Sequence, residues 1–357
     1  MIAIRELRVR AVRVPMREPH RTASGVVTES PLVLIDAITD EGVIGHGLIF
    51  TYTAAALGPV AQLTANLEEL VKGEVLAPAT ITAKLSKRFR LLGTQGLVGM
   101  ALAGIDMALW DALARVHGIS LARLLGGAPK PIPAYGPIGY DGAMESARVA
   151  EDWVKKGFGG MKAKIGYPSL REDVDVVGAI RNAVGPGVSI MVDYNQSLTP
   201  VEAVERIQAL EEFDLTWAEE PVLAHDFDGH AFVARAVRTP IHCGENWWGP
   251  LDMRHAIGAG ASDFVMPEVM KIGGVTGWRA AAALAEVHSI RMSNHLWPEV
   301  SAQLLSTTPM AHWLEYSDWW NPILEEPLVV EHGLALGGDG PGSGLSWNEK
   351  AVSGWLA

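Results

Sequence analysis

The sequence lacks the features that several classes of protein require. Its single cysteine, Cys243, excludes an intrachain disulfide framework and any zinc site built from several cysteines, and is typical of a reducing compartment. Lysine and arginine total 29 against 41 acidic residues and form no basic cluster, which argues against a nucleic-acid partner. No uncharged apolar run approaches the roughly 20 residues that span a bilayer, and charges within residues 1–10 interrupt the apolar stretch of a signal peptide. We therefore expect a cytoplasmic protein without a membrane or nucleic-acid partner.

What is present suits a globular protein with more than one domain. The chain has 357 residues, 48% of them hydrophobic and 20% charged, which is enough to bury sizeable cores and too long for one ordinary domain. Residues 1–130 have the pattern of an α+β domain. The predicted elements are a strand within 2–14, a hairpin of 31–38 and 43–50, and helices near 53–72, 78–91 and 97–117. Prolines at positions 129, 131 and 133 predict a domain boundary near residue 130.

Short apolar strands alternate with amphipathic helical segments from residue 131 to 319. The predicted strands are 132–136, 160–165, 188–193, 215–219, 240–245, 262–268, 290–295 and 311–315. Eight strands separated by seven helices favour an α/β fold of the (β/α)8 type, a (β/α)7β barrel. A doubly wound open sheet is the competing architecture, but no glycine-rich fingerprint follows the first strand. The tail, 320–357, looks irregular, and we interpret its glycine-rich run as a surface loop.

Titratable side chains end seven of the eight predicted strands, and in such a barrel the strand ends form the active site. Asp193, Glu219 and Glu245 follow one another at intervals of 26 residues, one strand–helix unit each. Three converging carboxylates repel one another, and their hard oxygen atoms suit Mg²⁺, or Mn²⁺, better than zinc. Any one of them could cap a helix or pair with a lysine. Because all three occupy the same position in successive strand–helix units, a metal site is favoured.

Two lysines end the second predicted strand. Lys162 and Lys164 are two residues apart, so their side chains share a face. Adjacent ammonium groups disfavour each other's protonation, and we expect a lysine pKa lowered toward neutrality and a lysine able to act as a base. The alternative is that both lysines merely pair with surrounding carboxylates.

A second base is expected on the other side of the barrel. Glu268 and His295 end adjacent strands, where a carboxylate can orient an imidazole and raise its basicity, although a lone histidine is often only a core residue. Bases on two sides of one carbon suit removal and return of a proton α to a carboxylate. Mg²⁺, together with an acid such as Glu315, would stabilise the resulting enediolate.

These residues lie in motifs that resemble the mandelate racemase subgroup of the enolase superfamily. The barrel motifs are MKAKIGYPSL (161–170), MVDYNQSL (191–198), WAEEP (217–221), GENWWGP (244–250), MKIGGVTGW (270–278) and HWLE (312–315). The segments at 31–36 and 103–113 resemble the subgroup's capping domain, so the resemblance spans nearly the whole chain. It implies an α+β capping domain over 1–130, a (β/α)7β barrel over 131–319, and a C-terminal segment, 320–357, that returns to the capping domain.

The resemblance also implies roles for the site residues, with Mg²⁺ held by the three carboxylates spaced at 26 residues. Lys164 would be the base for the (S) enantiomer of the substrate, and His295, held by Glu268, the base for the other. Glu315 would be the electrophilic acid, while Lys162 would bind the substrate carboxylate and tune the neighbouring lysine.

Further substrate contacts and the assembly follow from the same resemblance. Asn195 would contact the α-hydroxyl group, and Ser24 and Tyr52 of the capping domain are additional candidate contacts. A loop over 15–30 would close over the site and shape specificity. The subgroup's assembly implies a homo-oligomer, with an octamer as the form suggested.

Three positions depart from the family's pattern. The carboxylate that orients the histidine is Asp in the family and Glu268 here, one methylene longer. Pro137 stands where the family places a serine that contacts the substrate carboxylate. Ser24 and Ser317 replace apolar pocket residues and make the pocket more polar.

Two enzymatic readings and one non-enzymatic reading remain. The first is a Mg²⁺-dependent racemase or epimerase acting on an α-hydroxy acid related to mandelate, a small-molecule carboxylic acid. The alternative is an acid-sugar dehydratase, a lyase in which His295 expels a β-hydroxyl group. The third is a barrel that only binds metal or an organic acid, which would have no use for two bases. Formation of a 2-keto acid separates the dehydratase from the racemase.

Overall fold

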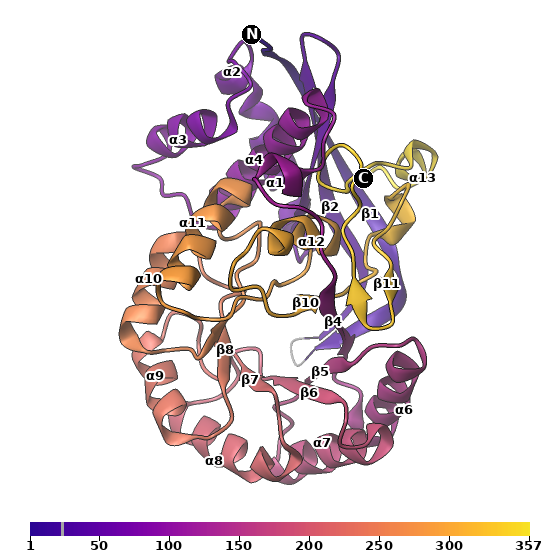
Figure 1. Cartoon of the computed structure of the whole chain (residues 1–357), viewed down its shortest axis with the longest axis vertical. Helices are drawn as coiled ribbons and strands as arrows, with labels where there is room; N and C mark the ends of the chain where they lie inside the picture. The colour runs from indigo at the N-terminus through magenta and orange to yellow at the C-terminus, as the bar shows by residue number, and fades with distance from the viewer. Residues whose placement is uncertain (23–24) are drawn as a thin grey trace.

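The computed structural model describes residues 1–22 and 25–357, and its N-terminal part is a three-stranded antiparallel sheet covered by helices (Figure 1). The strands are β1 (Ile4–Thr22), β2 (Gly25–Thr39) and β3 (Ile44–Phe50), in the order β1-β2-β3. The helices are α1 (Ala54–Asn66), α2 (Glu68–Val71), α3 (Pro78–Arg88), α4 (Gly96–Val116) and α5 (Leu121–Leu124). This α+β capping domain is the one that the sequence pattern predicts.

Helix α4 forms the core of the capping domain. By length and composition it could cross a membrane, but 83% of its most apolar window is buried inside the protein, as expected for a core helix. It packs closely on β3 because two strand residues have no side chain. A Cβ atom added at Gly45 would lie 2.3 Å from the carbonyl oxygen of Ala108, and one at Gly47 equally close to that of Gly104. Any larger residue at these two positions would push the helix off the sheet.

The first two strands extend further than expected. Residues 15–30, expected as a closing loop, are mostly strand in the structure, and only the tip at 23–24 lies outside the described residues. His20 pairs with Val27, and the ladder shifts register between Pro15 and His20. Pro19, which cannot donate a ladder hydrogen bond, lies within that shift. The segment is therefore a hairpin arm of the capping sheet, because its residues continue the β1–β2 pairing.

The second part of the chain is the predicted parallel barrel, with its helices on the outside (Figure 1). Its strands are β4 (Ile132–Ile138), β5 (Gly160–Lys164), β6 (Ser189–Asp193), β7 (Trp217–Glu219), β8 (Ile241–Cys243), β9 (Phe264–Val265) and β10 (Leu314–Glu315). The helices are α6 (Gly142–Lys155), α7 (Leu170–Val184), α8 (Pro200–Leu210), α9 (Phe227–Ala236), α10 (Pro250–Ala259), α11 (Gly274–Val287) and α12 (Pro298–Ser306). A 3₁₀ turn, η1 (Glu211–Phe213), follows α8. Pairing of β10 with β4 closes the barrel.

The seventh strand position is irregular. The expected strand at 290–295 forms only isolated bridges, in which Met292 pairs with Val265 and Ala311. His295 forms a separate bridge with Glu268. The backbone turns sharply just beyond, because Leu296 and Trp297 both have a positive φ of 47°. This departure from a regular strand places His295 at the mouth of the barrel.

The C-terminal segment packs against both parts of the molecule. It contains η2 (Asn321–Ile323), β11 (Val330–Glu331), β12 (Leu334–Ala335) and α13 (Glu349–Gly354). β12 pairs antiparallel with β4, and Leu356 bridges Val12 of the capping sheet. Figure 1 shows this segment, in yellow, beside β1 and β2.

Candidate active site

Three buried carboxylates meet at the carboxyl end of the barrel. Asp193 ends β6, Glu219 ends β7, and Glu245 lies two residues beyond β8. One oxygen of each lies within 4.8 Å of one oxygen of the others. The second carboxylate oxygen of Glu245 is buried and receives no hydrogen bond from the described residues. Close, buried, hard oxygen donors of this kind fit Mg²⁺.

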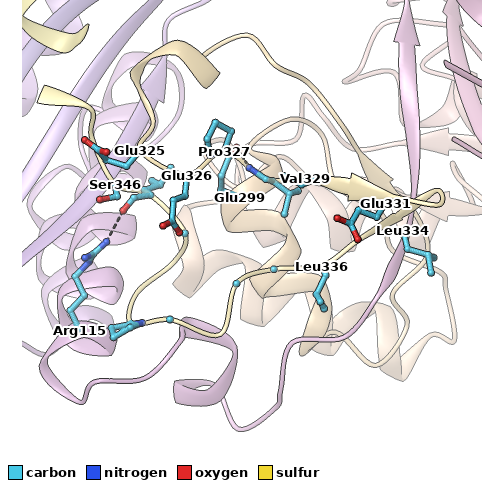
Figure 2. Close-up of a pocket in the computed structure, with 17 residues that line it drawn as sticks. Arg115, Glu299, Glu325, Glu326, Pro327, Val329, Glu331, Leu334, Leu336 and Ser346 are labelled. Atoms are coloured by element: carbon cyan, nitrogen blue, oxygen red, sulfur yellow. Dashed lines mark hydrogen bonds between the residues drawn. The ribbon is translucent and has the colours of Figure 1, made fainter. Parts of the chain in front are cut away.

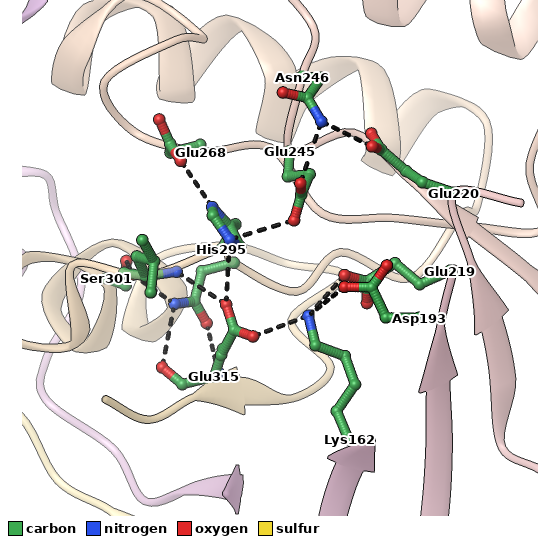
Figure 3. Close-up of polar contacts among 12 residues, drawn as sticks. Lys162, Asp193, Glu219, Glu220, Glu245, Asn246, Glu268, His295, Ser301 and Glu315 are labelled. Carbon is green, nitrogen blue, oxygen red and sulfur yellow. Dashed lines mark hydrogen bonds and ion pairs between the residues drawn. The ribbon is translucent and has the colours of Figure 1, made fainter. Parts of the chain in front are cut away.

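The two lysines of β5 lie among these carboxylates, and Figure 3 shows the contacts of Lys162. The Nζ atom of Lys162 is 2.5 Å from Oε1 of Glu219 and 2.7 Å from Oε1 of Glu315. The ammonium group of Lys164 donates a hydrogen bond to Asp193. Burial by itself would lower the pKa of both lysines, but the surrounding carboxylates outweigh it and raise the pKa of each. The expectation of a lysine pKa near neutrality is therefore wrong for this arrangement, because carboxylates outnumber the two ammonium groups.

The two lysines affect the pKa of Asp193 and that of Glu219 differently. Burial would raise the pKa of Asp193, but Lys164 and Lys162 hold it well below its usual range. For Glu219, burial and the neighbouring carboxylates raise the pKa well above its usual range despite Lys162. Negative charge at the barrel mouth is thus only partly compensated by protein groups, which is the condition that favours binding of a divalent cation.

His295 and Glu268 form a hydrogen-bonded pair on the other side of the mouth. Nδ1 of His295 is 2.6 Å from Oε2 of Glu268, so the longer glutamate side chain reaches the ring. Nε2 faces Glu245 at 3.1 Å and Glu315 at 3.8 Å. Burial would lower the pKa of His295, but these carboxylates together raise it. The ring is therefore held by Glu268 at Nδ1, while its other nitrogen faces the carboxylate cluster.

Glu315 lies between Lys162 and His295, at the end of β10. It accepts hydrogen bonds from Lys162 and from the backbone N–H of Leu296. Burial would raise its pKa, but chiefly Lys162 lowers it to about 2. Here Glu315 is a carboxylate acceptor, and its role as an acid stays a prediction.

A narrow cavity joins these groups. Lys162, Lys164, His295 and Glu315 all line it, and its volume is about 20 Å³, about the space of one water molecule. The remaining lining residues are His20, Pro137, Ile138, Leu296, Tyr316, Ser317 and Trp319. Thus two candidate bases from different parts of the barrel mouth and the candidate acid face one small space.

The structure places the other predicted substrate-contacting residues in different surroundings. Asn195 donates from Nδ2 to Asp193 at 3.1 Å, which places it beside a candidate metal ligand. Tyr52 hydrogen-bonds Glu268 and is absent from the cavity lining, so its placement differs from the substrate contact expected. Ser24 lies outside the described residues. Ser317 lines the cavity, as expected of a residue that replaces an apolar pocket residue of the family.

Several residues of the site were missed by sequence reasoning. Asn246 donates to Glu220 at 2.6 Å and to Glu245 at 3.0 Å, and accepts from Lys271 at 2.7 Å. Burial and the charge of Glu245 raise the pKa of Glu220 to about 8. The available signal was adjacency, since Asn246 and Glu220 each follow a candidate metal ligand directly. His20 had no such signal, because only the hairpin brings it to the cavity.

A second, larger cavity lies elsewhere (Figure 2). It is lined by the C-terminal segment, Arg115 and Glu299, and it contains none of the site residues predicted from the sequence. Burial raises the pKa of Glu299, whose carboxylate accepts hydrogen bonds from Trp320 and Leu328. The chemistry of a proton-transfer site is therefore concentrated in the narrower cavity.

Comparison with known proteins agrees with this geometry over the whole chain. Residues 4–126 match the mandelate racemase / muconate lactonizing enzyme N-terminal domain, and residues 145–351 match the enolase C-terminal domain-like family. The crystal structure of an enolase from Bradyrhizobium complexed with magnesium and mandelic acid is 45% identical, with a TM-score of 0.97, covering 100% of this chain and 99% of that one.

Two curated relatives are a dehydratase and a cycloisomerase. L-talarate/galactarate dehydratase of Salmonella typhimurium is 30% identical over 331 residues, covering 91% of this chain and 82% of the relative. D-galactarolactone cycloisomerase of Agrobacterium fabrum is 30% identical over 379 residues, covering 97% and 98%.

Fold and site together define a magnesium-dependent enzyme with a capping domain and a (β/α)7β barrel. The chain belongs to the mandelate racemase / muconate lactonizing enzyme family of the enolase superfamily.

Proposed function

We propose that this enzyme is a racemase or epimerase of a small α-hydroxy acid related to mandelate. The observation that carries the proposal is the placement of Lys164, at the end of β5, and His295, on the irregular seventh strand position, in one narrow cavity. An enzyme that inverts a carbon centre needs a base on each face of that carbon. The 45% identical relative crystallised with mandelic acid supports the substrate class.

Each side chain has a defined task in this proposal. Asp193, Glu219 and Glu245 would hold Mg²⁺, which would supply positive charge near the substrate carboxylate. Lys164 removes or returns the proton on one face of the α-carbon, which requires that the charge of Asp193, the carboxylate that chiefly raises the pKa of this lysine, be neutralised by the cation. His295 does so on the other face. The carboxylates of the site would repel the substrate carboxylate. Lys162 offsets this repulsion, because its ammonium group faces Glu219 and Glu315.

The cavity walls bear on the choice of substrate. Pro137, Ile138, Leu296 and Trp319 provide apolar surface that suits the phenyl ring of mandelate. His20 packs against Trp319 with ring centroids 4.9 Å apart, and burial lowers the pKa of His20 to about 3, so the ring is neutral at physiological pH. A mainly apolar wall with a neutral histidine favours an aryl group over a chain of hydroxyl groups.

A specific observation favours the second candidate, an acid-sugar dehydratase. The hydroxyl group of Ser317 is buried in the cavity wall and has no hydrogen-bond partner within residues 1–22 and 25–357. With His20, it offers the polar contacts that a hydroxylated substrate needs. The dehydratase and cycloisomerase activities of the curated relatives support this reading as well.

Proton NMR in D₂O distinguishes the candidates. Each enantiomer of mandelate is incubated with enzyme and Mg²⁺, and the α-proton signal and optical rotation are followed together. We expect both enantiomers to lose the α-proton signal while rotation decays. Variants Lys164→Met and His295→Asn serve as matched controls, since each removes one base and should spare exchange on the opposite face.

Three results would contradict or redirect the proposal. Exchange of (S)-mandelate alone, with rotation retained, would show that Lys164 works and that the histidine does not. Absence of α-proton exchange with both enantiomers would exclude mandelate as a substrate. Release of a 2-keto acid from an acid sugar would establish the dehydratase.

A further inference from the structure

Tyr52 reaches from the capping domain to the carboxylate that orients His295. It lies two residues beyond the end of β3, in a left-handed backbone conformation with φ of 57°. Its phenol donates a hydrogen bond to Oε2 of Glu268, the same oxygen that contacts Nδ1 of His295. A bulky residue with positive φ is strained and persists only where its surroundings fix it.

The surroundings of Tyr52 do fix the ring. Phe50 packs against it with ring centroids 4.7 Å apart, and the ammonium group of Lys271 lies 4.5 Å from the ring centroid. The same ammonium group is 3.9 Å from Oε2 of Glu268. The phenol is therefore held by both domains, since Phe50 belongs to the capping sheet and Lys271 to the barrel.

Glu268 depends on this contact because its other oxygen is free. Oε1 is buried and has no hydrogen-bond partner among the residues that the structure describes. A glutamate also has one more rotatable bond than the aspartate that it replaces in the resemblance, so it needs more restraint to hold one orientation. Within residues 1–22 and 25–357, Oε2 is the oxygen that is anchored, by Tyr52 and His295, with Lys271 at a longer distance.

We infer that Tyr52 is a positioning residue that fixes Glu268, and through it His295, so that the capping domain controls one of the two bases. This inference rests on the proposed function and deepens it. Lys164 has no contact with Tyr52 of this kind, since its ammonium group bonds to Asp193. Loss of the phenol should therefore impair proton transfer on the histidine face alone.

The test uses Tyr52→Phe, which keeps the ring against Phe50 and Lys271 and removes only the hydroxyl group. The readout is the initial rate of α-proton exchange in D₂O, measured separately for each enantiomer, because net racemisation in the two directions is tied by the overall equilibrium. We expect exchange on the histidine face to fall about 10- to 100-fold, as for loss of one hydrogen bond to a charged group. Exchange of (S)-mandelate by Lys164 should change less than about twofold.

A double-mutant cycle separates positioning from general structural damage. If Tyr52 acts through Glu268, Tyr52→Phe should have no further effect in a Glu268→Gln background. Tyr167→Phe is the matched control, because it removes a buried hydroxyl that accepts a hydrogen bond from the backbone N–H of Gly142 at 2.8 Å. That control should leave the ratio of the two exchange rates unchanged.

A second readout does not require turnover. In ¹⁵N-histidine-labelled, Mg²⁺-bound enzyme, the Nδ1 signal of His295, assigned with His295→Asn, should shift in Tyr52→Phe. It should not shift further when Tyr52→Phe is added to Glu268→Gln. Equal loss on both faces, an undiminished effect in the Glu268→Gln background, or no change in rate and signal would each overturn the inference. Failure of wild-type enzyme to exchange either enantiomer would overturn the proposed function alone, and the histidine signal would still decide the role of Tyr52.

Discussion

Two groups of buried carboxylates in this molecule differ in how their oxygens are satisfied. Where the capping domain meets the rest of the chain, Asp111 accepts hydrogen bonds from the backbone N–H groups of His46 and Ser343, from the Ser343 hydroxyl, and from Arg115. Asp106 accepts from Thr276, by both backbone and hydroxyl, and from Thr82.

At the barrel mouth the oxygens are not all satisfied. One oxygen each of Glu220 and Glu268 is buried without a hydrogen-bond partner among the described residues, and the buried second oxygen of Glu245 accepts no hydrogen bond there but lies 3.1 Å from Nε2 of His295. The carboxylates of the cap interface are therefore complete as they stand and hold the domains together. Those of the mouth are left with unused acceptor capacity, as expected of groups that bind a cation, a substrate or a proton.

The largest expected effect comes from Glu219→Gln at the mouth. The pKa of Glu219 is raised by burial and by neighbouring carboxylates, so its charge is unfavourable in the fold until a cation is bound. We expect activity to fall about 10³-fold or more and Mg²⁺ affinity to fall at least about 100-fold. The free energy of unfolding of the Mg²⁺-free variant should equal or exceed that of wild type. Calorimetric Mg²⁺ titration and denaturant unfolding measure both quantities, and a large loss of stability without loss of Mg²⁺ affinity would refute the contrast.

The reverse pattern is expected for Asp111→Ala at the cap interface. The substitution leaves several buried donors without an acceptor, including the Arg115 guanidinium at 2.6 Å. We expect the free energy of unfolding to fall by about 3–5 kcal/mol. Mg²⁺ affinity of the folded variant should stay within about twofold of wild type. An intact unfolding free energy in urea would show that these hydrogen bonds do not hold the domains together.

Sequence reasoning succeeded at the mouth for a geometric reason. Parallel strands of a barrel end at one face, so residues in phase with the strand–helix repeat, such as Asp193, Glu219 and Glu245, had to converge. It failed where the answer depends on packing between domains. The placement of Tyr52 on Glu268 follows from how the capping sheet meets the barrel, which no local pattern encodes.

Two further misses have physical causes. The lysine pKa prediction counted only the two ammonium groups and omitted the carboxylates around them. The strand expected at 290–295 is reduced to single bridges because two consecutive left-handed residues, Leu296 and Trp297, follow it and turn the chain toward the mouth. A regular apolar pattern predicts that a strand exists, but not how far its ladder extends.

The stability contribution of Asp106, at the cap interface, depends on pH. Burial raises its pKa from 3.8 to about 6 in spite of three hydrogen bonds. Because the folded protein binds this proton more tightly than the unfolded chain, the contribution of Asp106 to stability is present below pH 3.8 and is lost as pH rises through 6. The full loss is roughly 3 kcal/mol for a shift of this size.

The matched variant for this titration is Asp106→Asn, which can still accept from the N–H of Thr276 and donate to the two threonine hydroxyls. Its free energy of unfolding relative to wild type should rise by roughly 3 kcal/mol between pH 4 and pH 7. Urea unfolding at each pH measures this difference. A constant difference across that range would mean that Asp106 is ionised throughout and that its hydrogen bonds fully offset burial.

The smallest effect is expected where carboxylates are exposed. Arg148 on α6 bonds to Glu145 at 2.6 Å and to Asp152 at 2.6 Å, with all three side chains open to solvent. Water screens such pairs and the side chains lose rotational freedom when they form, so Arg148→Ala should leave the urea midpoint and both exchange rates within experimental error. A clear drop in the midpoint would show that short ion-pair distances alone predict stability here. Burial, and the oxygens that burial leaves unsatisfied, would then no longer separate the three kinds of carboxylate in this protein.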